Sequence, residues 1–419
     1  MYAVSGLPLV QAGTPGHGTT TNLGKGAAMK AVVWNGPGQV DLEDVADARI
    51  EQPTDAVVRL TMSAICGTDL HMVRGTMPGM QPGTVLGHEG VGVVEAVGSQ
   101  VRGFRPGDRV VIPSTICCGT CSYCRAGYTS QCDTANPNGP AAGTTFFGGP
   151  ESTGPVNGLQ ATYARIPFAS ANLIALPGSV TDEQAIVLSD IYPTAWFGAQ
   201  LAEVSRGDTV AVFGCGPVGQ LAIASAWRQG AGRVIAVDDI ASRLEMARSQ
   251  HAEPVDFGSE DPVAVVVELT GGVGADRVID AVGVDSYSGD PDEERDSEVS
   301  EAAGGGPTAW EHGSAPSQAA RWTVEAVAKA GSIGIIGVYP PTVQTWPIGT
   351  AMNKNLTVKM GNCPHRSVIP QLLDMVATGA SDPARLLTQV EPIDDVIEAY
   401  RVFDGRESGW VKVALAPVA

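Results

Sequence analysis

Five of the eight cysteines in this 419-residue chain fall within residues 117–132, CCGTCSYCRAGYTSQC. Four thiolates at the spacing C-x2-C-x2-C-x7-C suit one tetrahedral Zn²⁺ with no open position, so we expect a structural site. Disulfides, unpaired thiols and a redox C-x-x-C pair are the alternatives, although a redox pair needs only two cysteines. Cys117 is left over, and we interpret it as a spectator. The four predicted ligands are Cys118, Cys121, Cys124 and Cys132.

A second set of metal-ligating residues is spread along the chain. Cys66 in AICGTDLH and His88 in VLGHEG each follow a short apolar run, and VLSDIYPTAW offers Asp190. Three such ligands and an open position are typical of a catalytic zinc. Glu89 is either an alternate ligand or a residue beside the ligands. Taken singly, each has an ordinary structural interpretation: a core cysteine, a hydrogen-bonded histidine and a helix N-cap aspartate.

A nucleotide-binding pattern begins near residue 209. In TVAVFGCGPVGQLAIASAW, a strand-like run precedes a G-x-G-x-x-G turn and a helical run follows it. Gly214 permits the tight turn, Gly216 lets a pyrophosphate approach the backbone, and Gly219 allows close helix packing. Asp238 ends the next predicted strand, where a carboxylate binds ribose hydroxyls and favours NAD over NADP. Arg243 is either a ribose or adenine contact or a solvated arginine.

The remaining chain divides into two kinds of structure. Strand-like runs at 276–283 and 331–340 flank a helical run at 320–331, which indicates a parallel, doubly wound α/β sheet. Residues 30–180 are instead rich in valine, glycine and proline and predict short strands. The length also indicates two domains.

Composition excludes some partners. The formal net charge of −19 argues against nucleic acid and anionic membranes, and no apolar run approaches the ~20 residues of a membrane span. Residues 1–28 lack the features of a signal peptide, so we expect a flexible extension or an upstream start, and a cytoplasmic protein.

Together, ICGTDLH, GHEG, CGTCSYC, SDIYPT and GCGPVG resemble the zinc-dependent medium-chain alcohol dehydrogenase family, from Met29 to nearly the C-terminus. LSDIYPTAWFGA most resembles the glutathione-independent formaldehyde dehydrogenase branch, which has aspartate as third zinc ligand. The resemblance implies a GroES-like β-rich catalytic domain interrupted by a Rossmann domain. The expected parts are an extension (1–28), the catalytic domain (29–190) with a zinc lobe (about 113–135), the Rossmann domain (191–361) and the C-terminal catalytic part (362–419).

The resemblance also implies roles for individual residues. Cys66, His88 and Asp190 would hold the catalytic zinc, with Glu89 beside them and Asp69 orienting His88. Thr68 and His71 would form a proton relay. The residues expected near NAD are Thr194, Gly214, Gly216, Pro217, Val218, Gly219, Asp238, Arg243, Val282, Ile336 and Lys412.

The implied reaction is reversible hydride transfer between an alcohol, or an aldehyde hydrate, and NAD, with two zinc ions per chain and a homo-oligomer, a tetramer or a dimer. A polyol or threonine-type dehydrogenase and a zinc-free enone or quinone reductase are the alternatives, as is a non-enzymatic NAD-binding protein. Residues 285–317 form an insertion with nine acids and one base. It either covers the adenine end of NAD or is a plain mobile loop.

Overall fold

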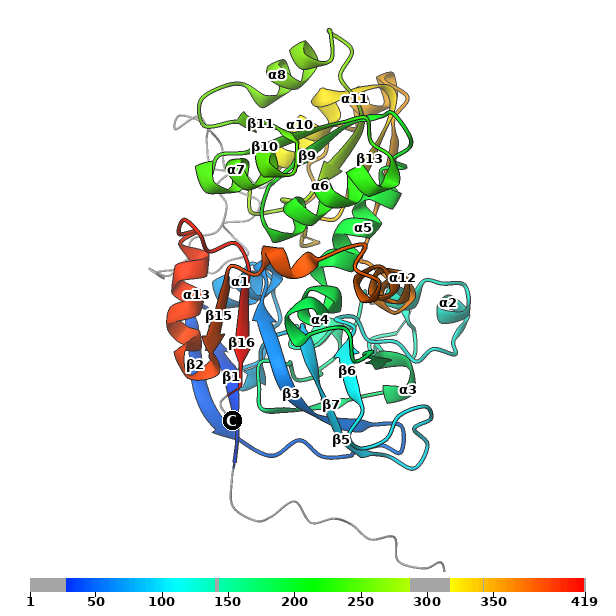
Figure 1. The fold of residues 1–419 in the computed structure, drawn as a ribbon, viewed down its shortest axis with the longest axis vertical. Coiled ribbons are helices and arrows are strands. Elements are labelled where there is room, and N and C mark those ends of the chain that lie inside the picture. The colour runs from blue at the N-terminus through cyan, green and yellow to red at the C-terminus, as the bar shows by residue number, and fades with distance from the viewer. Residues whose placement is uncertain (1–27, 140–142, 287–316, 342, 418–419) are drawn as a thin grey trace, which may run out of the picture.

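The structure, a computed structural model, describes residues 28–139, 143–286, 317–341 and 343–417. Almost all of the expected extension (1–28) and of the acidic insertion (285–317) therefore lies outside the described residues. Figure 1 shows one β-rich unit and one α/β unit along the long axis of the molecule, with α5 (Ile191–Leu201) and α12 (His365–Ala377) between them.

The β-rich unit joins the two ends of the described chain. In its larger sheet β16 pairs antiparallel with β3, with Ile65 opposite Val413, and β3 also pairs with β5 and β7. The smaller sheet has the order β2-β1-β4. The strands of the larger sheet are β3 (Ala56–Ile65), β5 (Gly90–Val97), β6 (Arg109–Ile112), β7 (Tyr163–Ile166), β8 (Ile174–Ala175), β15 (Gln389–Pro392) and β16 (Val413–Ala416); the smaller has β1 (Met29–Gly36), β2 (Gln39–Val45) and β4 (Thr84–Val85).

The α/β unit is a six-stranded, wholly parallel sheet of order β11-β10-β9-β12-β13-β14. Its central strand β9 carries the β-branched run TVAVF, and four of the five residues are buried, as expected for a strand covered on both faces. The predicted α/β class is confirmed. The strands are β9 (Thr209–Phe213), β10 (Arg233–Asp238), β11 (Glu253–Asp256), β12 (Ala275–Asp280), β13 (Val327–Ile335) and β14 (Thr357–Met360).

Two elements end earlier in the structure than the sequence predicts. The run expected as a strand to residue 283 ends at Asp280, because the Asp280 carboxylate accepts the N–H groups of Val282 and Gly283 and closes a turn. The helix expected to residue 331 ends at Ala326, and the chain enters β13 at once, pairing Val327 with Ala275.

One continuous apolar cluster links the two sheets. It runs from Val91 and Val111 of the larger β-sheet through α4 and α5 to Val212 and Val234 of the parallel sheet. No helix in the described ranges is long and apolar enough to cross a membrane. The other helices are α1 (Gly67–Arg74), α2 (Ser122–Arg125), α3 (Ala169–Asn172), α4 (Asp182–Ser189), α6 (Pro217–Gln229), α7 (Ala241–Ser249), α8 (Pro262–Leu269), α10 (Gln318–Ala326), α11 (Ile348–Asn353) and α13 (Val396–Asp404).

Candidate active site

Three segments bring a thiol, an imidazole and carboxylates together. Cys66 follows β3, His88 and Glu89 precede β5, and Asp190 separates α4 from α5. One ligand atom from each of these four residues lies within 4.8 Å of the others. Asp190 Oδ2 is 3.7 Å from Cys66 Sγ and 3.4 Å from His88 Nε2. Sulfur, nitrogen and carboxylate oxygen form a donor set that suits Zn²⁺.

His88 is turned toward this cluster by the neighbouring acid. Its Nδ1 lies 2.9 Å from Asp69 Oδ1, and Asp69 Oδ2 accepts the N–H of Cys66 at 2.9 Å. His88 Nε2 is buried and, within the described part of the chain, makes no hydrogen bond. An imidazole fixed at one nitrogen and left unsatisfied at the other fits a metal ligand.

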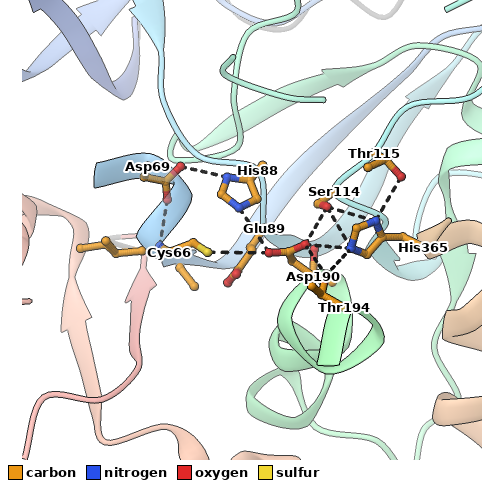
Figure 2. Close-up of polar contacts among 12 residues, drawn as sticks. Cys66, Asp69, His88, Glu89, Ser114, Thr115, Asp190, Thr194 and His365 are labelled. Carbon is orange, nitrogen blue, oxygen red and sulfur yellow. Dashed lines mark hydrogen bonds and ion pairs between the residues drawn. The ribbon is translucent and has the colours of Figure 1, made fainter. Parts of the chain in front are cut away.

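Asp190 is held by contacts that the sequence analysis missed. His365 Nε2, at the start of α12, lies 2.8 Å from Asp190 Oδ1, and the Ser114 hydroxyl donates to the same oxygen at 2.9 Å. Thr115 Oγ1 lies 3.1 Å from His365 Nδ1. Figure 2 shows the result: Oδ1 faces His365 and Ser114, which leaves Oδ2 toward Cys66 and His88.

This arrangement also decides the charge on Asp190. Burial works to raise the pKa of its carboxyl, but the neighbouring His365 and His88 imidazoles outweigh burial and hold that pKa well below its usual value. Its side chain makes no N-cap hydrogen bond to α5, so the alternative interpretation as a helix cap does not apply. The carboxylate is therefore available as an anionic ligand.

Lys412 corrects one expectation. The resemblance implied a position near NAD, but the side chain is fully buried beside Glu89, with Nζ–O distances of 2.8 and 2.6 Å. Lys412 Nζ also donates to the Ile65 carbonyl at 2.9 Å. Burial raises the pKa of Glu89 to about 7 although Lys412 opposes the shift. Because β16 pairs with β3, Lys412 is carried behind the ligand cluster and away from the cleft.

The four cysteines of residues 118–132 form the second cluster, and their sulfur atoms also lie within 4.8 Å of one another. All eight cysteines of the chain are free thiols. Backbone N–H groups donate to the sulfurs: Cys121 to Cys118 at 3.3 Å, Cys118 to Cys132 at 3.2 Å and Cys124 to Cys121 at 3.5 Å. The turns between neighbouring cysteines thus point the sulfurs at one centre. Cys117 is buried and is not part of this cluster.

The nucleotide-binding turn has the features expected from its glycines. Gly214 has a φ of 87°, which favours glycine. A Cβ at Gly219 would lie 1.8 Å from the Gly214 carbonyl oxygen, so only glycine allows α6 to pack against this turn. Pro217 is the first residue of α6, where a missing N–H costs nothing. Asp238 ends β10, and its Oδ2 accepts the N–H of Cys215 at 2.6 Å.

One cavity of about 1220 Å³ contains both the ligand cluster and this turn. Most of the residues predicted for the cofactor and the relay lie on its wall, whereas Gly219 supports the turn from behind and Lys412 does not line it. The predicted residues on the wall are Cys66, Thr68, His71, His88, Asp190, Thr194, Gly214, Gly216, Pro217, Val218, Asp238, Arg243, Val282 and Ile336.

His365 and Ser114 gave no recognisable signal in the sequence. His365, in the sequence GNCPHRSV, lies 175 positions after Asp190 (365 − 190) and 251 positions after Ser114. No short motif joins them, because their proximity depends on how α12 packs against α4 and α5.

Comparison with known proteins identifies the family. The alcohol dehydrogenase GroES-like domain matches residues 52–178, and the zinc-binding dehydrogenase domain matches residues 217–289. A zinc-type alcohol dehydrogenase-like protein of Bacillus subtilis, itself uncharacterized, is 39% identical over 393 residues, which covers 93% of this chain and 100% of that protein. The chain belongs to the zinc-dependent medium-chain alcohol dehydrogenase family.

Other relatives of this dehydrogenase agree with the assignment. The solved structure of the alcohol dehydrogenase TADH from Thermus sp. ATN1 has 34% identity and a TM-score of 0.77, covering 93% of this chain and all of that one. The glutathione-independent formaldehyde dehydrogenase of Pseudomonas aeruginosa is 36% identical, but over only 61% of this chain and 66% of that protein. The expected closeness to that branch is therefore partial. The family makes this chain an oxidoreductase that acts on alcohols with a nicotinamide cofactor.

Proposed function

We propose that this dehydrogenase binds two zinc ions and oxidises short alcohols and hydrated aldehydes reversibly with NAD. The observation that carries the proposal is the cluster of Cys66, His88 and Asp190 on the same cavity wall as the glycine-rich turn. A donor set of one thiol, one imidazole and one carboxylate, with space beside it, suits a catalytic rather than a structural zinc.

The residues around this cluster have separate tasks. When bound, zinc supplies Lewis acidity and the nicotinamide accepts hydride. Thr68 takes the proton of the substrate hydroxyl and passes it toward His71, which exchanges it with solvent. Val282 and Ile336 line the cavity with apolar surface, which helps to exclude water around the nicotinamide.

NAD is the proposed cofactor because of Asp238. The carboxylate is buried in the turn and accepts the N–H groups of Asp239 and Ile240, each at 3.0 Å, as well as that of Cys215. It is thus fixed at the cavity wall, where it would accept ribose hydroxyls and repel a 2′-phosphate.

Replacing Asp238→Gly is expected to raise the KM for NAD about tenfold, since a charged hydrogen-bond acceptor is lost. It should also raise the ratio of kcat/KM for NADP to that for NAD. Asp238→Asn keeps one side-chain oxygen that can accept the N–H groups of the turn, so it distinguishes an effect on cofactor binding from a loss of loop stability. Asp239→Asn, at the next residue, is the control. An unchanged cofactor ratio in both Asp238 variants would contradict the ribose role.

Assembly and location complete the proposal. The edge strand β14 and the nearby α11 expose Ile348, Met352 and Met360, and an exposed apolar sheet edge favours pairing with a second copy. We propose a homo-oligomer and favour a tetramer over a dimer. The four cysteines of the zinc lobe form no disulfide, which is typical of a reducing compartment, and we propose the cytoplasm.

A substrate panel tests the proposed function. Short alcohols, polyols and aldehydes are offered with NAD or NADP, and the nicotinamide absorbance is followed with and without a zinc chelator. We expect turnover of short alcohols with NAD that the chelator abolishes and zinc restores. Glutathione should not be required for formaldehyde oxidation. Chelator-resistant turnover, or reduction of enones alone, would contradict the proposal.

A further inference from the structure

An ion-pair network crosses from the β-rich unit to the α/β unit beside the cavity. Arg74, at the end of α1, is buried and lies 2.7 Å from Asp285 Oδ2 through Nη1 and 2.9 Å from Asp404 Oδ1 through Nε. Asp404 ends α13 of the β-rich unit, whereas Asp285 follows β12 of the parallel sheet. Among the described residues, Asp285 is therefore the member of this network that the cofactor-binding unit supplies.

The second oxygen of Asp285 faces the expected proton relay. Asp285 Oδ1 lies 3.7 Å from His71 Nδ1, one turn of α1 before Arg74. Both atoms are buried, and among the described residues neither makes a hydrogen bond. Arg74 occupies Oδ2 and fixes the carboxylate, so Oδ1 is left for the imidazole. The distance exceeds that of a hydrogen bond, but two opposite charges interact strongly at this separation in a buried site.

We propose that Asp285 is a positioning residue of the proton relay, which faces His71 with a carboxylate and stabilises the imidazolium formed during alcohol oxidation. The proposal rests on the proposed function of Thr68 and His71. In each turnover the substrate hydroxyl would lose a proton, which reaches His71 and then solvent, and the nicotinamide, when bound, would accept the hydride. Asp285 gains and loses no proton in this sequence.

The surrounding charges explain why His71 needs such a partner. Burial lowers the pKa of its imidazole, Asp285 acts in the opposite direction, Arg74 lowers it further and Asp69 raises it. The carboxyl of Asp285 itself has a lowered pKa, since His71, Arg74 and Arg406 together outweigh its burial. Asp285 thus remains ionised and offsets part of the cost of charging a buried imidazole.

Asp285→Asn is the direct test. Without the carboxylate the imidazolium is less stable, so the pKa of His71 falls, and the acid limb of the pH profile of kcat for alcohol oxidation should move down by about one pH unit. The ¹³C NMR titration of the histidine rings, with His71→Gln to assign the signal, should show the same shift without substrate. Asp285→Glu, which keeps the charge, should restore most of the parental profile.

Asp404→Asn is the matched control, because Asp404 is a second carboxylate that pairs with Arg74 but, unlike Asp285, is not paired with His71. We expect an unchanged pH profile. The proposal is overturned if Asp285→Asn leaves the His71 titration unaltered, or if Asp404→Asn shifts it equally. Since that titration needs no substrate, it tests the pairing even if no alcohol is oxidised, which would instead count against the proposed function.

Discussion

The two cysteine-containing clusters differ in how far apart their ligands lie along the chain. The four thiols of the zinc lobe come from residues 118–132, and the N–H groups of that same loop point the sulfurs inward. Cys66, His88 and Asp190 come from three separate segments, and His365 from a fourth supports them. The first cluster is a property of one loop, whereas the second exists only in the complete fold.

The comparison also separates stability from chemistry. Four thiolates occupy all four coordination positions of a tetrahedral zinc ion and leave none for a substrate. Three ligands leave one position, and the geometry of the open site then depends on the residues that hold the ligands, here Asp69, Ser114 and His365. Substitutions in the loop should therefore act on stability, and substitutions around Asp190 on activity.

Cys66→Ser should destroy the open zinc site, and we expect it to have the largest effect on turnover. Loss of the sulfur ligand should remove one zinc equivalent and lower kcat by about 10³-fold or more, since metal-ion catalysis contributes several kcal/mol. The melting temperature should stay close to the parental value. Cys117→Ser, at a buried cysteine outside both clusters, is the control. Retained activity in Cys66→Ser would refute the open zinc site.

Cys121→Ser should break the closed site instead. Without one of four thiolates the lobe loses its zinc equivalent, and we expect the melting temperature to fall by about 10 °C or more. Metal analysis and calorimetry measure the two effects together. The protein that remains folded should retain zinc at the open site and much of its kcat. An unchanged melting temperature and metal content would argue against a structural role.

His365→Ala tests the support of the open site separately from its ligands, because it leaves every proposed ligand in place. Asp190 Oδ1 then keeps Ser114 but loses His365, and we expect zinc affinity at the open site and kcat to fall about 10- to 100-fold. Competition with a chelator measures the affinity, and the spectrum of the cobalt-substituted protein reports ligand geometry without turnover. His365→Gln should recover part of both. If the cobalt spectrum and the affinity are unchanged, His365 does not position Asp190.

The same difference decides what the sequence could reveal. The glycine-rich turn and the cysteine lobe are local, so their spacing predicted the strand, the turn and the cluster. The α/β class followed from alternating strand-like and helical runs. His365 and Ser114 could not be found this way, because their contact depends on the packing of α12. The misplacement of Lys412 has the same origin, since strand pairing between β16 and β3 carries it behind Glu89.

The pairing of β16 with β3 has a consequence for biosynthesis. Ile65 is synthesised long before its partner Val413, so β16 cannot pair with β3 until residue 413 has left the ribosome. The parallel sheet, which ends with β14 at Met360, is complete before then. The nucleotide-binding unit can thus fold first, and Lys412, the buried partner of Glu89, is synthesised only after it.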